Sequence, residues 1–348
     1  MALCVSAPGR VCLFGEHQDY LGLPVIAAAI DLRVRVEGRP ANERVLRLRL
    51  PDMGEERAFP LENTGVLPYR NDSDYLTAAV NVLHRAGVRW GSGWEAEVRG
   101  NIPLNSGASS SSALQVAWCG FLLLAGGHEN PARSWVARLA YESEVLEFNA
   151  PGGMMDQYAA ALGGAIWLDC SNPDGVEELP QPGGELLLVD SGQPKDTTGV
   201  LGRVRRPMEP LADAVLDAGA PLEDLDGDRR RMVEANRESY RLTGVARELL
   251  RERGCIEELG RLLTAHHEQL SRGLGVSTPE IDGWLEAGMR AGALGGKING
   301  SGGGGTFFLL CREGDHGPEE EMHRQGLRTW RLRTGPGLQW QLSGRGVA

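Results

Sequence analysis

Alternation of hydrophobic and charged residues predicts a β-sheet in the first part of the chain. Apolar and charged side chains alternate over residues 33–37 and Val45–Leu50, and the same period of two returns over residues 94–98. Three more strand-like segments lie at residues 3–7, 11–14 and 25–30. The alternation predicts that one face of this sheet is exposed to solvent.

Apolar residues at helical spacing predict a helix over residues 74–85, which ends at Gly87. A second apolar segment extends to Ala125, ends at Gly126-Gly127 and follows a glycine-serine loop. Further helices are predicted at residues 134–147, 154–162, 226–244, 245–253, 256–270 and 279–291, and further strands at 165–168, 185–190 and 306–310. This mixed order of helices and strands predicts an α+β fold.

The length of the chain favours two domains, because 348 residues exceed the usual size of a single core. Residues 171–184 are rich in proline, glycine and acidic side chains, a composition typical of a linker. We therefore expect an N-terminal domain over residues 1–180 and a C-terminal domain over residues 181–348.

Composition and charge exclude several classes of protein. With 41% hydrophobic and 24% charged residues, the chain is neither disordered nor collagenous in type. A net charge of −11 argues against a nucleic-acid partner, because such proteins need a basic surface to displace counterions. We expect no membrane partner, because residues 1–10 lack a signal-peptide pattern and no apolar run has membrane-spanning length. Six cysteines without CxxC spacing indicate reduced thiols, so we expect a cytoplasmic protein.

Two nucleotide-binding motifs do not account for the glycine run at residues 300–305. A dinucleotide-binding fingerprint follows a strand and opens a helix, whereas this run precedes the apolar strand predicted at 306–310. Gly296-Lys297 is followed by Ile298 rather than Ser or Thr, which excludes a Walker A loop. A flexible linker is the alternative, but the flanking apolar residues favour a tightly held turn.

The serine run at residues 109–112 stands directly before a predicted helix. Backbone N–H groups at a helix start are unpaired and carry partial positive charge, so phosphate oxygens can bind there. A serine hydroxyl at the same place can ligate Mg²⁺. A mobile serine-rich turn is the alternative, but the position before a helix favours a site for ATP.

Four polar side chains crowd a short turn between the strands predicted at 11–14 and 25–30. They are Arg10, Glu16, His17 and Asp19. This density of hydrogen-bonding groups suits a polyhydroxylated ligand. A solvated surface turn is the alternative, which the flanking apolar strands make the weaker interpretation.

Four segments resemble motifs of the GHMP small-molecule kinases, in the order that this family has them. They are PGRVCLFGEHQDY (residues 8–20), PLNSGASSSSA (103–113), PGGMMDQ (151–157) and KINGSGGGG (297–305). The first is very similar to the signature of galactokinases, and residues 266–282 also resemble that group. The resemblance implies an α+β, two-domain GHMP kinase fold with the active site in the cleft between the domains.

The resemblance also implies a role for each matching residue. Asp156 would be the catalytic base with Arg10 as its cationic neighbour, and Ser111 and Glu144 would ligate Mg²⁺. Sugar hydroxyls would be held by Glu16, His17, Asp19 and the backbone of Gly153. The ATP-binding loop would comprise Pro103, Asn105, Ser106, Gly107, Ala108, Ser109, Ser110, Ser111, Ser112 and Ala113. The glycine loop that supports it would contain Gly300, Ser301, Gly302 and Gly303.

Several positions differ from the galactokinase pattern. Galactokinases usually have Asn in place of Cys12, Thr in place of Gln18, Leu in place of Ala108 and Cys in place of Gly152. Residues 189–198 look closer to mevalonate-type relatives. The base and the metal ligands are retained, whereas residues near the sugar differ.

The resulting hypothesis is ATP- and Mg²⁺-dependent phosphorylation of a monosaccharide at its anomeric hydroxyl. Conversion of galactose to galactose 1-phosphate is the leading version of this hypothesis. Another sugar 1-kinase, a mevalonate-like kinase and a catalytically silent sugar sensor are the alternatives. The expected partners are a sugar and ATP, with the protein a monomer or homodimer. His266-His267-Glu268 lacks the HExxH order of a zinc site, so we expect these residues on a helix surface.

Overall fold

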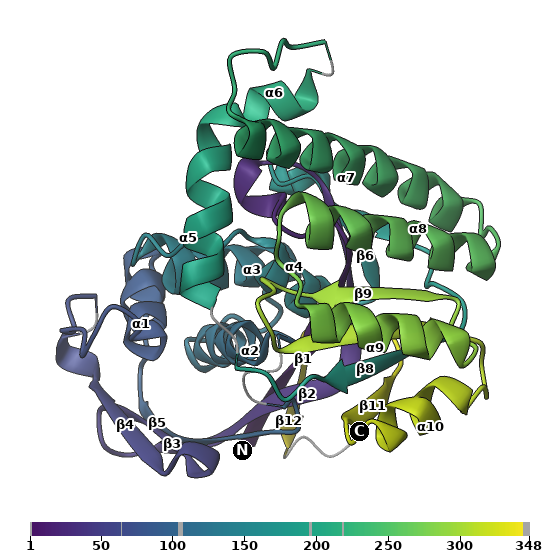
Figure 1. The fold of residues 1–348 in the computed structure, drawn as a ribbon. Coiled ribbons are helices and arrows are strands. Elements are labelled where there is room, and N and C mark those ends of the chain that lie inside the picture. Colours follow the sequence, from purple (N-terminus) through teal and green to yellow (C-terminus); the bar gives the residue numbers. More distant parts are fainter. Residues whose placement is uncertain (1, 64, 104–106, 195–196, 218, 344–348) are drawn as a thin grey trace.

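The computed structural model describes residues 2–63, 65–103, 107–194, 197–217 and 219–343, and within them two β-sheets with helices packed on both (Figure 1). The larger sheet has eight strands, with the order β12-β1-β2-β5-β3-β4, and β6 and β7 extend it from β2. Its strands are β1 (Ala2–Phe14), β2 (Val25–Ala41), β3 (Val45–Leu50), β4 (Glu55–Pro60), β5 (Gly93–Gly100), β6 (Ala165–Leu168), β7 (Glu177–Leu179) and β12 (Gln339–Ser343).

The first two strands are longer than the sequence pattern predicted. β1 joins the predicted strands 3–7 and 11–14, and register shifts at Pro8/Arg10 and Cys12/Phe14 absorb the irregularity of the Pro8-Gly9 segment. β2 likewise joins the predicted strands 25–30 and 33–37. Gly9 is required because the carbonyl of Ala108 approaches so closely that an added Cβ would lie 2.5 Å from it.

The smaller sheet is antiparallel, with the strand order β11-β8-β10-β9. Its strands are β8 (Glu185–Asp190), β9 (Gly295–Asn299), β10 (Thr306–Cys311) and β11 (Arg328–Leu332). The glycine run therefore connects β9 to β10, and it opens a strand as the sequence predicted.

Helices α2 and α4 pack on the larger sheet, α1 and α3 pack against these two helices or against each other, and α8 to α10 pack around the smaller sheet (Figure 1). The helices are α1 (Tyr75–Arg85), α2 (Ser110–Ala125), α3 (Arg133–Tyr141), α4 (Met155–Leu162), α5 (Thr197–Met208), α6 (Ala212–Leu216), α7 (Gly227–Arg251), α8 (Ile256–Glu268), α9 (Pro279–Arg290) and α10 (Gly317–Arg324). Single 3₁₀ or π turns occupy Asp19–Leu21, Pro51–Met53, Leu61–Asn63, Glu142–Leu146, Pro173–Gly175, Glu209–Leu211 and Gln269–Gly273.

Two helix predictions need correction. The helices predicted at 226–244 and 245–253 are the single helix α7. Gly244 faces open space, and its low helix propensity alone is too small a free-energy cost to end the helix. The helix predicted at 134–147 changes into a π turn at Glu142. This turn lies beside the site described below, where such irregularities are common.

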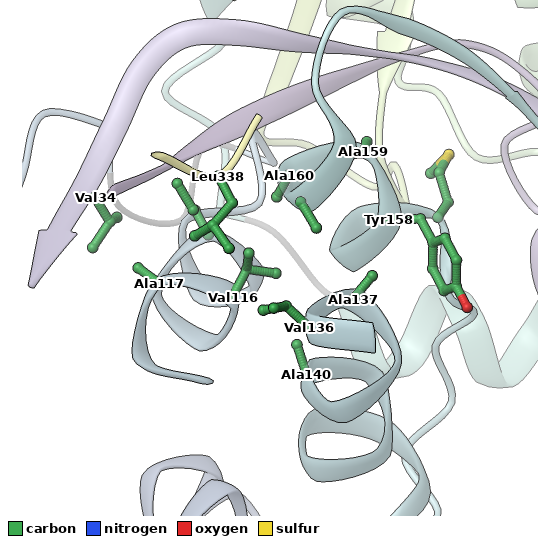
Figure 2. Close-up of a cluster of buried hydrophobic side chains, with 14 of the residues drawn as sticks. Val34, Val116, Ala117, Val136, Ala137, Ala140, Tyr158, Ala159, Ala160 and Leu338 are labelled. Atoms are coloured by element: carbon green, nitrogen blue, oxygen red, sulfur yellow. The ribbon is translucent and has the colours of Figure 1, made fainter. Parts of the chain in front are cut away.

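The main core lies between the larger sheet and helices α2, α3 and α4, where small side chains allow close approach of the helices (Figure 2). Ala137 and Ala140 of α3 and Ala159 and Ala160 of α4 are all buried in this core. Leu338, which precedes β12, is fully buried in the same core. The last described strand thus belongs to the first sheet, and the division at residues 180 and 181 stays a prediction.

No helix in the described ranges is both long and apolar enough to cross a lipid bilayer.

Candidate active site

A polar cavity of about 420 Å³ opens where the two sheets meet the start of α2. It is lined by Arg10, Glu16, His17, Asp19, Tyr20, Tyr75, Gly107, Ser109, Ser110, Ser111, Ser112, Glu144, Val145, Ala150, Pro151, Gly152, Gly153, Met155, Asp156, Gln157, Leu201, Gly300 and Ser301. Segments that are far apart in sequence therefore meet in one place, and all four motifs that the sequence analysis singled out contribute to it.

A bidentate ion pair joins Arg10 and Asp156 at this cavity. Arg10 lies within β1 rather than in the turn after it, and its Nε and Nη2 atoms are 2.6 and 2.7 Å from the two oxygens of Asp156 in the first turn of α4. Burial lowers the pKa of Arg10, but the charge and hydrogen bonds of Asp156 outweigh burial and raise it overall. Ser109 also donates a hydrogen bond to Asp156. The carboxylate is thereby fixed in orientation by three donor groups from two side chains.

Residues 107–109 of the predicted phosphate loop lead directly into α2. Ser109 is the N-cap residue in a left-handed conformation (φ 58°), and its hydroxyl is used by Asp156 rather than by the helix. The first N–H groups of α2 therefore keep their partial positive charge beside the cavity. Asn105 and Ser106, which were predicted to bind ATP, lie outside the described residues. Pro103 and Ala113 are described but do not line the cavity.

Glu144 stands in the π turn after α3, with its side chain almost fully buried. Ser112 and Gln157 donate hydrogen bonds to it at 3.1 and 2.7 Å, and no Arg or Lys of the described chain pairs with it. Burial raises the pKa of Glu144, and the hydrogen bonds from Gln157 and Ser112 offset part of that rise. Ser111 lines the cavity beside it. A carboxylate without a cation, next to serine hydroxyls, is a set of oxygen ligands that fits Mg²⁺.

Two of the predicted sugar ligands contact other parts of the protein. Glu16 is buried, and one of its oxygens pairs with the fully buried Lys297, while the other has no hydrogen-bond partner among the described residues. His17 has a left-handed backbone (φ 64°), and its ring contacts the Tyr20 hydroxyl and the Ser301 carbonyl, each at 3.1 Å. A carbonyl oxygen only accepts, so Nε2 donates to Ser301 and Nδ1 accepts from Tyr20.

Asp19 and Gly153 lie next to each other in the cavity wall. Asp19 is only partly buried, and its backbone neighbour Tyr20 donates to it at 2.9 Å. Burial and the nearby charge of Asp156 raise the pKa of Asp19 to about 6. A Cβ on Gly153 would lie 2.2 Å from the Asp19 carboxylate, so only glycine leaves room for this side chain.

A second, apolar pocket of about 680 Å³ adjoins the polar cavity and was not predicted from the sequence. Its apolar wall comprises Val34, Leu50, Met53, Leu76, Val98, Ile102 and Leu114. Tyr75, Ser110 and Ser111 line both spaces, so the two are neighbours at the start of α2. The pocket draws its residues from several strands and helices, and no local motif marks such a set.

The structure corrects one further expectation and adds two residues. His266 and His267 are buried rather than on a helix surface, because α8 packs against β9 and the end of β1, where the centroid of the His266 ring lies 5.5 Å from that of Phe14. Lys297 and Asn299 contact the predicted site although neither was given a role. Both residues lie inside the glycine-loop motif, so their membership in this motif was the sequence signal that could have identified them.

Comparison with known proteins identifies the class that this fold and site define. The GHMP kinases N terminal domain matches residues 74–164, the GHMP kinases C terminal family matches residues 246–322, and the Galactokinase galactose-binding signature matches residues 2–40. The chain belongs to the GHMP kinases, a family of ATP-dependent small-molecule kinases.

Individual relatives lie in two branches of that family. A galactokinase of Thermococcus kodakarensis is 33% identical over 92% of this chain and 92% of that protein. A mevalonate kinase of Pyrococcus furiosus is 29% identical over 89% of this chain and 90% of that protein. The structure of Lactococcus lactis galactokinase complexed with galactose has the same fold, with a TM-score of 0.82 at 23% identity over 97% of this chain and 95% of that one.

Proposed function

We propose that this GHMP kinase transfers the γ-phosphoryl group of ATP to the anomeric hydroxyl of a neutral monosaccharide, with galactose as the preferred acceptor and galactose 1-phosphate as the product. The observation that carries the proposal is Asp156, held by Arg10 and Ser109 at the wall of a cavity that also contains Asp19, Glu144 and the start of α2.

Asp156 acts as the base in this mechanism. A sugar hydroxyl is a weak nucleophile, and a carboxylate within hydrogen-bond reach accepts or orients its proton during transfer. Arg10 and Ser109 hold the carboxylate in one orientation, which supports in-line attack by positioning rather than by covalent chemistry.

The residues near the start of α2 serve the nucleotide. Ser111 and Glu144 would hold Mg²⁺, which would supply positive charge to offset the charge that develops on the transferring phosphate. The N–H groups of the first turn of α2 bind the phosphates. The adjoining apolar pocket, bounded by Leu76 and Leu114, takes the flat, largely apolar nucleobase.

The charges around the cavity favour a neutral acceptor over mevalonate, which carries a carboxylate. Arg10 is the only lysine or arginine among the described lining residues, and Asp156 already neutralises it. Lys297 lies behind the wall and pairs with Glu16. The partly exposed Asp19 forms no ion pair with a lysine or arginine of the described ranges, so a second carboxylate brought beside it would be repelled.

The proposal is tested by measuring ADP release from MgATP with galactose, other aldoses, galacturonic acid, mevalonate and no acceptor, followed by ³¹P NMR of the product. Galacturonic acid is the matched control, because it differs from galactose only by a carboxylate at carbon 6. We expect strong turnover with galactose, phosphate at the anomeric carbon, and little turnover with either carboxylate-bearing acceptor. Preferred turnover of mevalonate or galacturonic acid would refute the acceptor assignment. Galactose binding without turnover would instead indicate the silent sugar sensor.

A further inference from the structure

The two hydrogen-bonding edges of β1 have different neighbours. One edge of β1 pairs with β2 along most of its length, whereas the other pairs with β12 only over Ala2–Ser6. Farther along, in the described chain, that second edge is contacted by groups other than a strand. The Arg10 N–H donates to the Ala108 carbonyl at 3.2 Å. At Cys12, two side chains of β9 take over the role of a neighbouring strand.

Lys297 and Asn299 provide these contacts from one face of β9, since they are two residues apart in a strand. The Lys297 ammonium donates to the Cys12 carbonyl at 3.1 Å, and the Cys12 N–H donates to Asn299 Oδ1 at 3.0 Å. Both side chains are fully buried. The smaller sheet is thus attached to β1 through side chains, at a point two residues from Arg10.

Asn299 uses its other amide atom on the phosphate loop. Its Nδ2 donates to the Gly107 carbonyl at 3.1 Å. Because the Cys12 N–H can only donate and the Gly107 carbonyl can only accept, one orientation of the amide satisfies both contacts. A single side chain therefore bridges β1 and the phosphate loop.

The loop needs such support because of its backbone. Gly107 and Ser109 both have left-handed conformations, with φ of 79° and 58°. A non-glycine residue keeps such a conformation only where its surroundings hold it. The Gly107 carbonyl also accepts from Arg10 Nη1 at 2.6 Å, so Asn299 and Arg10 hold the same peptide group from two sides.

We propose that Asn299 is a positioning residue that sets the shape of the phosphate loop, and that the affinity for the phosphates of ATP depends on it although its side chain does not line the cavity. This inference rests on the proposed function, because it takes the loop before α2 as the ATP phosphate site.

Asn299→Asp tests the bridge with little change of shape. The variant keeps an oxygen for the Cys12 N–H but replaces the donor that faces Gly107 with an acceptor. We expect the Kd for MgADP and the KM for MgATP to rise about tenfold, the factor that corresponds to about 1.4 kcal/mol and to the loss of one buried hydrogen bond. The Kd for galactose should stay within twofold. Asn299→Ser repeats the test without a new charge.

Asn81→Asp is the matched control. Asn81 is also buried, and its side chain also links backbone groups: its oxygen accepts from the N–H groups of Gly65 and Leu67, and its nitrogen donates to the Leu67 carbonyl. The Asn81→Asp variant should bind MgADP as tightly as the wild type, even if its melting temperature falls. The proposal is overturned if folded Asn299→Asp and Asn299→Ser keep MgADP affinity within twofold. It is also overturned if both variants lose sugar and nucleotide affinity equally, because a purely structural role predicts that result.

Calorimetric titration with MgADP separates this inference from the proposed function. Wild-type protein that binds MgADP but phosphorylates no acceptor would refute the proposed function while the Asn299 comparison still decides the inference. Wild-type protein that binds no MgADP would overturn both.

Discussion

Replacing Lys297 with methionine should destabilise the protein strongly through the charge that it leaves behind. Lys297 is fully buried and Glu16 is only 2% exposed, so the carboxylate loses its cation where water has little access to it. Breaking a buried pair in this way costs about 3–5 kcal/mol of unfolding free energy. Methionine has nearly the same length as lysine, which limits any cavity contribution.

The double variant Glu16→Gln/Lys297→Met separates charge from packing. It removes both charges, so we expect it to recover most of the loss and to lie within about 2 kcal/mol of the wild type. The assay is guanidinium denaturation followed by circular dichroism. Arg39→Met is the control, because the Arg39–Glu95 pair is exposed and should contribute about 1 kcal/mol or less. The reasoning is refuted if Lys297→Met costs no more than Arg39→Met, or if the double variant is no more stable than the single one.

Three further predictions concern the reaction. Asp156→Asn should lower kcat by a factor of about 10²–10⁴ while MgADP binding stays measurable by calorimetry, and near-normal turnover would exclude Asp156 as the base. Glu144→Gln should raise the Mg²⁺ concentration for half-maximal activity by about tenfold, roughly the loss of one charge-assisted ligand, and an unchanged metal titration would remove Glu144 from the ligand set. Because the pKa of Asp19 is raised to about 6, its carboxylate is lost as pH falls below 6, so the KM for galactose should rise between pH 7 and pH 5. Asp19→Asn should have a high KM that does not vary over this range, and a variant with the wild-type profile would contradict the assignment.

The raised pKa of Asp19 also fixes the sign of its effect on stability. Between about pH 4 and pH 6 the native protein holds this proton while the unfolded chain has released it. The contribution of Asp19 to stability is therefore fully present below pH 4 and is lost as pH rises through 6.

Local patterns predicted most of the secondary structure but not its continuity. Apolar segments located the strands at both ends of β1 and the first part of β2, and alternation located the second part of β2. The Pro8-Gly9 segment nevertheless looked like a break, because a bulge that is supported by tertiary contacts has no local signature. Gly244 looked like a helix end, but a glycine inside a helix costs only a small amount of free energy. Packing of the rest of α7 outweighs that cost, and the local sequence does not show this packing.

The members of the site could be located from the sequence, but not their partners. The motifs identified Arg10 and Asp156, which are 146 residues apart, and the structure joins them. The motif at 8–20 also contains Glu16, but its partner Lys297 is 281 residues away, and no spacing rule relates the two. The apolar pocket is still harder to predict from the sequence, because its walls come from short segments whose residues also look like ordinary core residues.

The pairing of β1 with β12, which sets Ala2 opposite Ser343, has a consequence for synthesis. The first strand leaves the ribosome early but gains this neighbour only after the last strand has been made. A nascent chain released before β12 would keep an exposed strand edge, which is a template for association with other chains. The same adjacency places the two ends of the described chain side by side, so a short peptide could join them and new ends could be opened in a surface loop.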